Sequence, residues 1–426
     1  MKIIDICDLN KASVSKKERV GKIQYLDTSN ITKNFIGSFQ NLDFDKAPSR
    51  AQRKVADKTI LYSTVRPNQE HYGIMEKPAA NMIVSTGFTT IDIKEEFKND
   101  FDAYYLYYLL TQKWVTERLQ SIADNSTTSY PSIRPEDLGE LSFSFPCIKI
   151  QKKIGAVLKA LDDKIHLNEQ INRNLEELAR LIYDYWFVQF DFPNKNGKPY
   201  KSSGGKMVWN EKLKRNIPAG WQTAKVRDVI LPIERGISYS SDEITDPNGT
   251  PMINLACFDK KGNYRTGEFK YFTGKFKNED KIYPFDMLIA CTDLTQKADI
   301  IGTPIFSPTE YPFYVFSMDL VKITPIRSND KQFLYYYLKH PAFHHYIKPF
   351  ASGTTVKHLR VDGLLDYPIF MPDESVRDAF AEVMEPIRHK IADNTSQGVE
   401  LSKMRDYLLP LLMNGQVSVK SSNGSK

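Results

Sequence analysis

Residues 151–186 read QKKIGAVLKALDDKIHLNEQINRNLEELARLIYDYW, and this stretch determines how the rest of the chain is organised. Apolar residues recur in it mostly in alternating steps of four and three, as in the seam of a coiled-coil helix. Such a helix is about 50 Å long at about 1.5 Å per residue, and its apolar stripe needs a partner. The seam positions are Ile154, Leu158, Leu161, Ile165, Ile171, Leu175, Leu178 and Ile182.

A second stretch with the same pattern lies near the C-terminus. The two registers coincide at an offset of 226 residues, so the helices are predicted to pair with each other in antiparallel orientation. Asn168 and Asn394 are equivalent on the two seams, where a polar side chain either fixes the register or faces solvent. Pro386 means that the second helix either kinks there or begins with this residue in its first turn. The second seam is Phe380, Met384, Ile387, Ile391, Leu401, Met404, Leu408 and Leu411.

Each helix closes one copy of a duplicated unit. Similar short strings precede both helices in the same order, for example at 57–60 and 286–289 and at the Thr-Thr pairs 127–128 and 354–355. Each unit reads as short β-like runs broken by turn residues, then a Tyr-rich helix, a Thr-Thr loop and a proline. The period is far too long for a solenoid, so it indicates two copies of a whole domain with its helix.

The predicted fold class is therefore α+β, with two similar globular domains joined by two long antiparallel coiled-coil helices in a pseudo-two-fold arrangement. The segment between the first helix and the second domain is rich in Gly, Pro, Ser, Asn and Lys, which is typical of a linker. The predicted segments are a first domain at 1–146, a helix at 147–190, a linker at 191–219, a second domain at 220–372, a second helix at 373–414 and a tail at 415–426.

The composition is that of a globular protein. At 426 residues the chain is too long for one ordinary core, and its 41% hydrophobic and 26% charged residues lie well away from the disordered class. A net charge of +6 permits nucleic-acid binding without requiring it. The four cysteines form no Cys-x-x-Cys pair, and no apolar run is long enough for a membrane span. These features predict a cytoplasmic protein without a membrane segment.

Sequence motifs exclude two catalytic classes. No two prolines are adjacent, so the Asn/Asp-Pro-Pro-aromatic loop of amino-methyltransferases is absent, and no Gly-Lys pair continues into a P-loop. His340, His344 and His345 have a spacing seen in metal sites, but packing and surface roles are commoner, and we predict neither a metal nor a catalytic residue. Tyrosines at 104–108 and 335–337 could stack on bases, but on apolar helices they more often form core.

One segment resembles a known family. Residues 187–221, FVQFDFPNKNGKPYKSSGGKMVWNEKLKRNIPAGW, resemble the central linker of the specificity subunits of Type I restriction-modification enzymes. The Thr-Thr loops before Pro146 and Pro372, each followed by a long helix, also resemble that family's conserved regions. The family often shows Glu-Gln at the head of these helices, where this chain has Gln151 after an isoleucine and, in the second copy, Arg377.

The resemblance implies a DNA-binding subunit without catalytic activity. Two target-recognition domains would each read one half of a split site in double-stranded DNA, while the helices act as a spacer and dock two DNA adenine methyltransferase subunits. It also implies that this chain holds no cofactor, since S-adenosylmethionine belongs to the modification subunits. ATP belongs to restriction subunits, which are optional further partners.

Loops beside the central strand-like runs carry side chains suited to DNA. Lys and Arg neutralise phosphates, whereas Arg, Gln and Asn read guanine or adenine through paired hydrogen bonds. The alternative is that these are ordinary solvated loops. The candidates in the first domain are Arg50, Gln52, Arg53, Lys54, Thr64 and Arg66. Those in the second domain are Lys260, Lys261, Arg265, Thr292, Thr295 and Lys297, with Lys357 and Arg360 near the Thr-Thr loop.

Two other functions fit the sequence. A coiled-coil adaptor would bind proteins only and show no sequence preference for DNA. A self-contained nuclease would use an acidic patch such as Asp92, Glu95 and Glu96 with a metal ion, but no convincing second acid-lysine arrangement accompanies it. For the DNA reader, a rod of ~50 Å spans about one and a half turns of B-DNA at ~34 to 36 Å per turn, leaving central base pairs unread.

Overall fold

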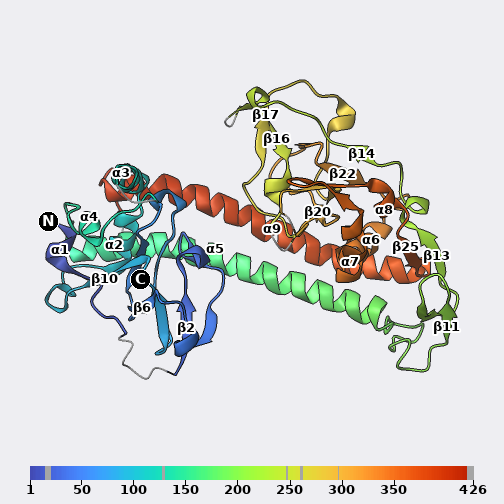
Figure 1. Cartoon of the computed structure of the whole chain (residues 1–426), viewed down its shortest axis with the longest axis horizontal. Helices are drawn as coiled ribbons and strands as arrows, with labels where there is room; N and C mark the ends of the chain where they lie inside the picture. The colour runs from blue at the N-terminus through green and yellow to red at the C-terminus, as the bar shows by residue number, and fades with distance from the viewer. Residues whose placement is uncertain (15–20, 127–129, 246–247, 260–261, 296, 420–426) are drawn as a thin grey trace, which may run out of the picture. The chain divides into compact units, whose positions relative to one another are not determined.

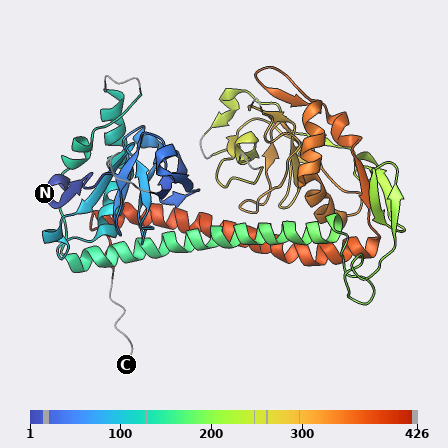
Figure 2. The same ribbon diagram turned by 60° about the horizontal axis from the view of Figure 1, so that its bottom comes forward.

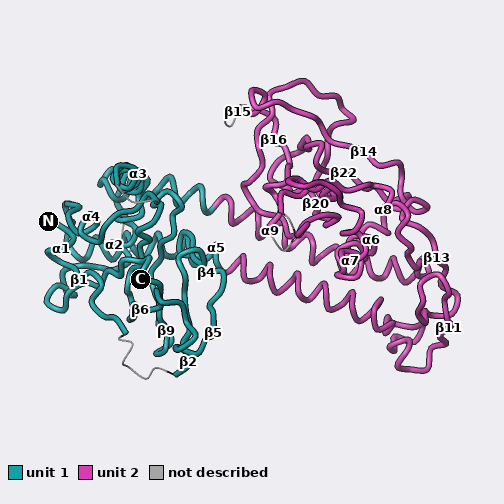
Figure 3. The backbone as a smooth tube through the Cα atoms, viewed as in Figure 1, with its two compact units in different colours: residues 1–166, 401–426 teal, residues 167–400 magenta. Residues whose placement is uncertain are grey.

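A computed structural model describes the chain except for residues 15–20, 127–129, 246–247, 260–261, 296 and 420–426 (Figure 1). The chain forms two compact units, which we call unit 1 (Met1–His166 with Leu401–Lys426) and unit 2 (Leu167–Glu400) (Figure 3). Two long helices contribute to both units, α5 (Ile148–Tyr183) and α9 (Glu374–Met413). None of the helices in the described part of the chain combines the length and apolar character needed to cross a bilayer.

Unit 1 is built on two four-stranded sheets. Its strands are β1 (Cys7–Leu9), β2 (Lys22–Leu26), β3 (Ile31–Thr32), β4 (Phe35–Ile36), β5 (Gln40–Asp43), β6 (Ala51–Lys54), β7 (Ile60–Ser63), β8 (Tyr72–Ile74), β9 (Met82–Ser85) and β10 (Phe88–Ile93). One sheet has the order β1-β10-β7-β8 and is antiparallel throughout. The other has the order β5-β2-β9-β6, in which β2 and β9 are parallel. All four residues of β7 are buried, as expected for a central apolar strand.

Four helices of unit 1 accompany these sheets, α1 (Ile3–Ile6), α2 (Ala103–Leu110), α3 (Lys113–Asp124) and α4 (Pro135–Gly139). Helix α2 begins at an N-cap in which the Asp102 carboxylate accepts a hydrogen bond from the backbone N–H of Tyr105. Tyr105, Tyr107 and Tyr108 are buried in the same core cluster as β7. The prediction of core tyrosines is confirmed for these three, whereas Tyr104 is partly buried and donates from its hydroxyl to Glu76 Oε1 at 2.7 Å.

Unit 2 repeats the plan with additional strands. Its strands are β11 (Met207–Asn210), β12 (Arg215–Pro218), β13 (Gln222–Lys225), β14 (Glu234–Arg235), β15 (Ile244–Thr245), β16 (Thr250–Ile253), β17 (Lys270–Phe272), β18 (Met287–Ala290), β19 (Thr292–Asp293), β20 (Pro304–Phe306), β21 (Val315–Phe316), β22 (Leu320–Ile323), β23 (Ala351–Ser352), β24 (Lys357–Leu359) and β25 (Pro368–Met371). The sheet β14-β22-β18-β20 is antiparallel throughout, and the sheet β15-β17-β16-β21 contains one parallel pair, β16 with β21.

The duplication predicted from the sequence is confirmed by this topology. Each unit has one antiparallel four-stranded sheet, in which β7 and β18 are each the third strand in order. Each unit also has a second four-stranded sheet with a single parallel pair of strands. Each then continues through three short helices into a long one. The short helices of unit 2 are α6 (Asp330–Lys339), α7 (Pro341–Ile347) and α8 (Val361–Leu365), and Tyr335, Tyr336 and Tyr337 of α6 are buried as predicted.

An equivalent side chain fastens the start of each long helix to its unit. Gln151 donates from Nε2 to the Pro146 carbonyl oxygen at 2.8 Å, and its Oε1 accepts from the backbone N–H of Asp102 at 3.0 Å. Arg377 donates from Nε to the Pro372 carbonyl oxygen at 2.9 Å and forms a buried ion pair with Asp330. The two starts therefore use different residue types for the same junction.

Within unit 2, α5 and α9 run side by side in opposite directions (Figure 2). Asn168 Nδ2 donates to Gln397 Oε1 at 2.8 Å, and Asn172 Nδ2 donates to Thr395 Oγ1 at 3.0 Å. The residue numbers increase along α5 as those of their partners decrease along α9, as antiparallel helices require. Asn394 Nδ2 donates to Asn172 Oδ1 at 2.9 Å. Asn168 and Asn394 are 1% and 4% exposed, so both face the partner helix and not solvent. Buried polar pairs of this kind restrict a helix pair to one register.

Two predicted seam positions are wrong. Leu178 and Met404 are 45% and 51% exposed, and they occupy equivalent positions on the two helices. A straight helix has about 3.6 residues per turn, so a strict repeat of 3.5 drifts off the buried face. Helix α9 starts before Pro386, which rules out a start at that proline. Of the other seam residues, Ile154, Leu158, Ile165 and Ile391 are buried, and Leu161, Ile171, Leu175, Ile182, Ile387, Leu401, Leu408 and Leu411 are partly buried.

The segment at 191–219, predicted as a linker, is packed against unit 2. Phe190, Phe192 and Ile217 are buried in the main core cluster of unit 2 together with Trp221. The Phe192 and Trp221 rings are stacked with centroids 5.1 Å apart. The Gly, Ser and Lys content of the segment reflects its exposed turns, while buried aromatic residues at its two ends fix its path.

Candidate nucleic-acid interface

In unit 1 the loop after β7 meets the segment that follows the Thr-Thr pair. The backbone N–H of Arg66 donates to the Pro131 carbonyl oxygen at 3.0 Å, and the N–H of Ile133 donates to the Thr64 carbonyl oxygen at 2.9 Å. Arg66 has a left-handed backbone with φ of 47°, and its guanidinium lies 5.7 Å from the centroid of the Tyr130 ring. Both side chains are exposed, so this surface offers a cation beside an aromatic face.

Thr64 lies behind this surface. Its hydroxyl donates to the Gly87 carbonyl oxygen at 3.0 Å, and its backbone N–H donates to the same oxygen at 2.9 Å. The residue therefore joins the loop to the turn between β9 and β10. Its side chain is half-buried, so its predicted role is better read as positioning Arg66 than as touching a base.

Unit 2 brings together the equivalent segments. Strand β19, directly after the central strand, pairs with β24, and β23 and β24 enclose the second Thr-Thr loop. Lys297 is exposed on the loop after β19, while Lys357 Nζ donates to the Gly353 carbonyl oxygen at 2.6 Å. The exposed Arg360 guanidinium lies 5.7 Å from the Phe350 ring centroid. Three predicted cations therefore belong to one group of connected loops.

A buried carboxylate, whose structural role was not predicted from the sequence, shapes the loop after β19. Asp293 is 1% exposed and accepts from the backbone N–H of Thr295 at 2.6 Å and of Ile300 at 2.7 Å. The Thr295 hydroxyl accepts from the N–H of Asp299 at 3.2 Å, so it is part of the turn. Thr292 is 5% exposed, and a buried hydroxyl cannot reach a base edge; the prediction of a DNA contact there is withdrawn.

The other cluster of unit 1 lies on and beside the edge strand β6. Arg50 Nη2 is 2.8 Å from Asp27 Oδ2, and Gln52 Nε2 donates to the Ser49 carbonyl oxygen at 2.6 Å. Arg53 donates to Ser13 Oγ at 3.1 Å and is half-buried, which lowers the pKa of its guanidinium. Lys54 is exposed. Arg50 and Lys54 are thus the cations of this cluster that can reach a phosphate without leaving a buried site.

The Asp27 carboxylate beside Arg50 is held ionised. Burial raises its pKa, but hydrogen bonds from Tyr25 and Ser29 and the positive charge of Arg50 outweigh this effect. The pKa of Asp27 therefore lies below its ordinary value. The carboxylate anchors Arg50 at the sheet edge, while the Arg50 side chain stays 58% exposed.

Three other residues of unit 2 were predicted to contact DNA: Lys260, Lys261 and Arg265. Lys260 and Lys261 lie outside the described residues. Arg265 Nη2 is 2.8 Å from Glu268 Oε1, and both side chains are exposed, so the pair is weak and open to exchange with a phosphate.

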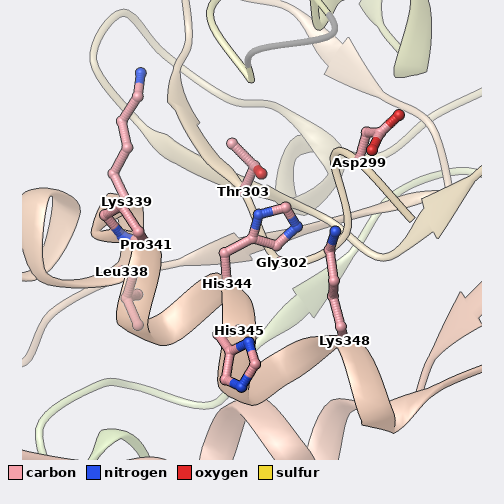
Figure 4. A pocket seen from close by; sticks show the side chains of 9 residues that line it. All are labelled: Asp299, Gly302, Thr303, Leu338, Lys339, Pro341, His344, His345 and Lys348. Carbon is pink, nitrogen blue, oxygen red and sulfur yellow. The ribbon is translucent and has the colours of Figure 1, made fainter. Parts of the chain in front are cut away.

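A depression of about 470 Å³ lies beside the loop after β19 (Figure 4). His344 and His345 of α7 line it together with Lys348, Asp299 and five other residues. The His344 Nε2 atom is 3.1 Å from the Ala298 carbonyl oxygen, a separation suited to donation by a neutral imidazole, and burial lowers the pKa of His344. His344 therefore has a packing role that holds α7 against the loop.

Alternative chemistry finds little support in the described part of the chain. No group of three or more His, Cys, Asp or Glu side chains there is arranged to hold a metal ion. Asp92 of the acidic patch accepts from the Thr59 hydroxyl at 2.5 Å, and burial raises its pKa. Glu95 is paired with Lys98 at 2.6 Å, an exposed pair in adjacent turns. These carboxylates serve local structure.

The sequence of both units matches a known family. A family model described as "Type I restriction modification DNA specificity domain" matches residues 1–177 and 218–400. The chain belongs to this family. It is a specificity subunit of type I restriction-modification systems, a class of subunit without catalytic activity of its own, and a purely structural adaptor is not favoured.

Individual relatives agree with this family. The chain is similar to the "Type I restriction enzyme HindI specificity subunit" of Haemophilus influenzae, with 26% identity over 93% of this chain and 94% of the relative. It is 25% identical to the "Type I restriction enzyme MjaIX specificity subunit" of Methanocaldococcus jannaschii, over 92% and 86% of the two chains. The crystal structure of a Type-I restriction-modification system S subunit from M. genitalium has the same fold, with a TM-score of 0.58 at 16% identity over 99% and 96% of the chains.

Proposed function

We propose that each unit of this specificity subunit reads one half of a bipartite site in double-stranded DNA. The observation that carries this proposal is the repetition of one arrangement in two units. In each, a central strand is followed by a loop that meets the segment after the Thr-Thr pair and exposes cations. The loops carry different residues in the two units, for example Arg66 with Tyr130 in unit 1 and Lys297 with Lys357 in unit 2. Two different half-sites are therefore expected.

The exposed cations divide into two roles. Arg66 has the fork of donors that reads guanine in the major groove, and its left-handed backbone presents that fork beyond the loop. Arg50, Lys54, Lys297, Lys357 and Arg360 are suited to phosphates, which fix the protein on the duplex but carry no sequence information. Loss of a phosphate contact should weaken binding to all sequences, whereas loss of Arg66 should change the sequence preference.

The long helices are the proposed spacer. Helix α5 has 36 residues, which is about 54 Å at about 1.5 Å per residue. That length corresponds to about one and a half turns of B-DNA, so base pairs between the half-sites would remain unread. The polar contacts between Asn168, Asn172 and the facing helix support a fixed register for this spacer.

Docking of two methyltransferase subunits is supported by a duplicated apolar stripe on the outer faces of the helices. Leu178, Leu181 and Tyr185 of α5 and its extension are 45%, 51% and 39% exposed. The residues 226 positions later are Met404, Tyr407 and Leu411, of which the first two are 51% and 70% exposed. Exposed apolar patches mark protein interfaces, and two equivalent stripes suit two copies of one partner.

In the proposed complex the chemistry belongs to the partners. The methyltransferase subunits bring S-adenosylmethionine, and restriction subunits, where they join, bring ATP; this chain supplies recognition only. We also propose a cytoplasmic location, in keeping with four cysteines that are all free thiols.

A binding selection tests the proposal. The full chain, purified with its methyltransferase subunit, is incubated with a library of random duplexes at moderate salt, and the bound fraction is sequenced. We expect enrichment of two short motifs at a constant separation. A bound pool with the composition of the input would instead identify a protein adaptor, and enrichment of one continuous motif would contradict two independent readers.

A further inference from the structure

The packed segment at 191–219 carries almost all of the net charge of the protein. It contains six lysines and one arginine against Asp191 and Glu211, a formal charge of +5, while the whole chain of 426 residues has +6. All other parts of the chain, including the recognition loops, therefore have a combined formal net charge of +1. We call residues 191–219 the lysine platform.

The lysines of the platform are exposed and mostly unneutralised. Among the described residues, only Lys214 has a carboxylate partner, Glu211 Oε2 at 2.9 Å. The other five have no acidic side chain within ion-pair distance in that part of the chain. The six exposed residues are Lys195, Lys198, Lys201, Lys206, Lys212 and Lys214. Five ammonium groups without an ion pair among the described residues lie within 18 residues, although the charge of Lys201 also acts on Asp191. Their mutual repulsion is a cost that a polyanion would remove.

Buried groups hold the first half of the platform in one conformation. The Asp191 carboxylate accepts from the backbone N–H of Ser202 at 2.7 Å and from its hydroxyl at 2.6 Å. Burial raises the pKa of Asp191, but these hydrogen bonds and the positive charge of Lys201 outweigh that effect and lower it. Asn194 Oδ1 accepts from the N–H of Lys198 at 3.1 Å, and the Tyr200 ring stacks on Phe192 with centroids 4.7 Å apart. The lysines therefore project from a structured loop.

The second half of the platform is a hairpin fastened beside its turn. Strands β11 and β12 pair with each other over four residues, and Lys212 and Lys214 lie in the turn between them. Arg215 donates to the Val188 carbonyl oxygen at 3.2 Å, and its guanidinium lies 4.6 Å from the Phe190 ring centroid. A Cβ at Gly205 would lie 2.4 Å from the Tyr200 ring, so the chain passes this ring closely before the hairpin. Preorganised charges lose little entropy on binding.

We propose that the lysine platform binds the phosphate backbone of duplex DNA without regard to sequence, as an anchor separate from the recognition loops of the two units. The composition favours DNA over a protein partner, because protein interfaces are depleted of Lys and use Arg and aromatic residues, whereas Lys is a strongly hydrated point charge suited to phosphates. This inference rests on the proposed DNA-reading function and adds affinity to it.

The test is the salt dependence of DNA binding. The triple variant Lys195→Gln, Lys198→Gln and Lys201→Gln is prepared in the full chain with its methyltransferase subunit, and Kd for a duplex containing the selected motifs is measured from 50 to 200 mM salt. Three lost phosphate contacts should reduce the slope of log K against log salt by about 2.7. The affinity advantage of the wild type should then shrink about 40-fold across this range.

A matched control removes the same charge elsewhere. Lys149, Lys152 and Lys164 are exposed on α5, and their replacement by Gln should leave the slope nearer to that of the wild type. An equal change in both triple variants would show a general effect of net charge and overturn the proposal. An unchanged slope in the platform variant would also overturn the proposal, because the platform would then bind no phosphates. Loss of the methyltransferase subunit from this variant in a pull-down would overturn it as well, because the platform would then bind a protein.

The ratio of affinities for selected and scrambled duplexes separates this inference from the proposed function. The platform variant should keep the wild-type ratio, because phosphate contacts are blind to sequence. A reduced ratio in the variant would place the platform in base recognition and contradict the anchor. A wild-type ratio near one would instead contradict the reading function itself.

Discussion

Replacement of Asp162 by Ala should destabilise unit 1 by about 3 kcal/mol, because it breaks a buried ion pair between the two long helices in that unit. Asp162 in α5 accepts from the Tyr108 hydroxyl at 2.6 Å and from Arg405 Nη1 of α9 at 2.8 Å. The side chains of Asp162 and Arg405 are 7% and 15% exposed. Asp162 thus joins the Tyr-rich helix and both long helices.

The expected magnitude follows from what the substitution leaves behind. Removal of one partner of a buried pair costs about 3–5 kcal/mol. Arg405 keeps a second contact, to Asp406 at 2.8 Å, so the lower end of this range applies to Asp162→Ala. Arg405→Ala should cost more, since it leaves a buried carboxylate with Tyr108 as its remaining partner. The double variant should be less destabilised than the sum of the singles, by about 1–3 kcal/mol.

Amide hydrogen exchange measures this effect locally. A loss of about 3 kcal/mol should speed exchange roughly a hundredfold in α2 and in the first half of α5, while the core strands of unit 2 stay unchanged. Asp163→Ala is the matched control, because Asp163 is 58% exposed and its ion pair among the described residues is with Lys159 in its own helix. Its cost should be at most about 0.5 kcal/mol. Equal effects of the two alanine variants, or strict additivity in the double variant, would refute the reasoning.

Three further outcomes follow from the site. Arg66→Ala should weaken DNA binding by about 1–3 kcal/mol and relax the preference at one half-site, which a binding selection would show; uniform weakening of all sequences would make Arg66 a phosphate contact. Leu181→Asp and Tyr407→Asp should each reduce the number of bound methyltransferase subunits from two to one in native mass spectrometry, and retention of both copies would argue against the stripes. Burial lowers the pKa of His344, so the unfolded state binds its proton first and unit 2 should lose stability as pH falls below about 6.5. His344→Gln should reduce this pH dependence of the thermal midpoint and the exposed His345→Gln should not; the reverse result would count against the packing role.

Long-range repetition made much of the fold predictable from sequence. Heptad-like spacing and the 226-residue offset identified two long helices. The sequence left open whether Asn168 and Asn394 face solvent, and the structure places both on the paired faces. Apolar neighbours identified the tyrosines of α2 and α6 as core. These features are local or periodic, so the pattern of residue types carries them directly.

Features that depend on contacts between distant strands were not predictable. Thr292 is a polar residue that follows a strand in the sequence, which is typical of a DNA-contacting loop, but the pairing of β19 with β24 buries it. Nothing near Asp293 in the sequence indicates that its carboxylate organises the following loop, and the approach of Tyr130 to Arg66 depends on a turn joined by tertiary hydrogen bonds. The prediction that Leu178 lies on the seam was wrong for a different reason. Its spacing fits the heptad repeat, but it lies on an exposed face of the helix.

The central claim is that two related domains of one chain read separate halves of one DNA site. Long-read sequencing of methylated adenines, in cells with this gene, without it, and with the Arg66→Ala variant, tests it most directly. We predict a motif of two short parts separated by a constant unread gap, present only with the gene, in which the variant alters one part and leaves the other and the gap unchanged. A continuous motif, or a variant that alters both parts together, would contradict the claim.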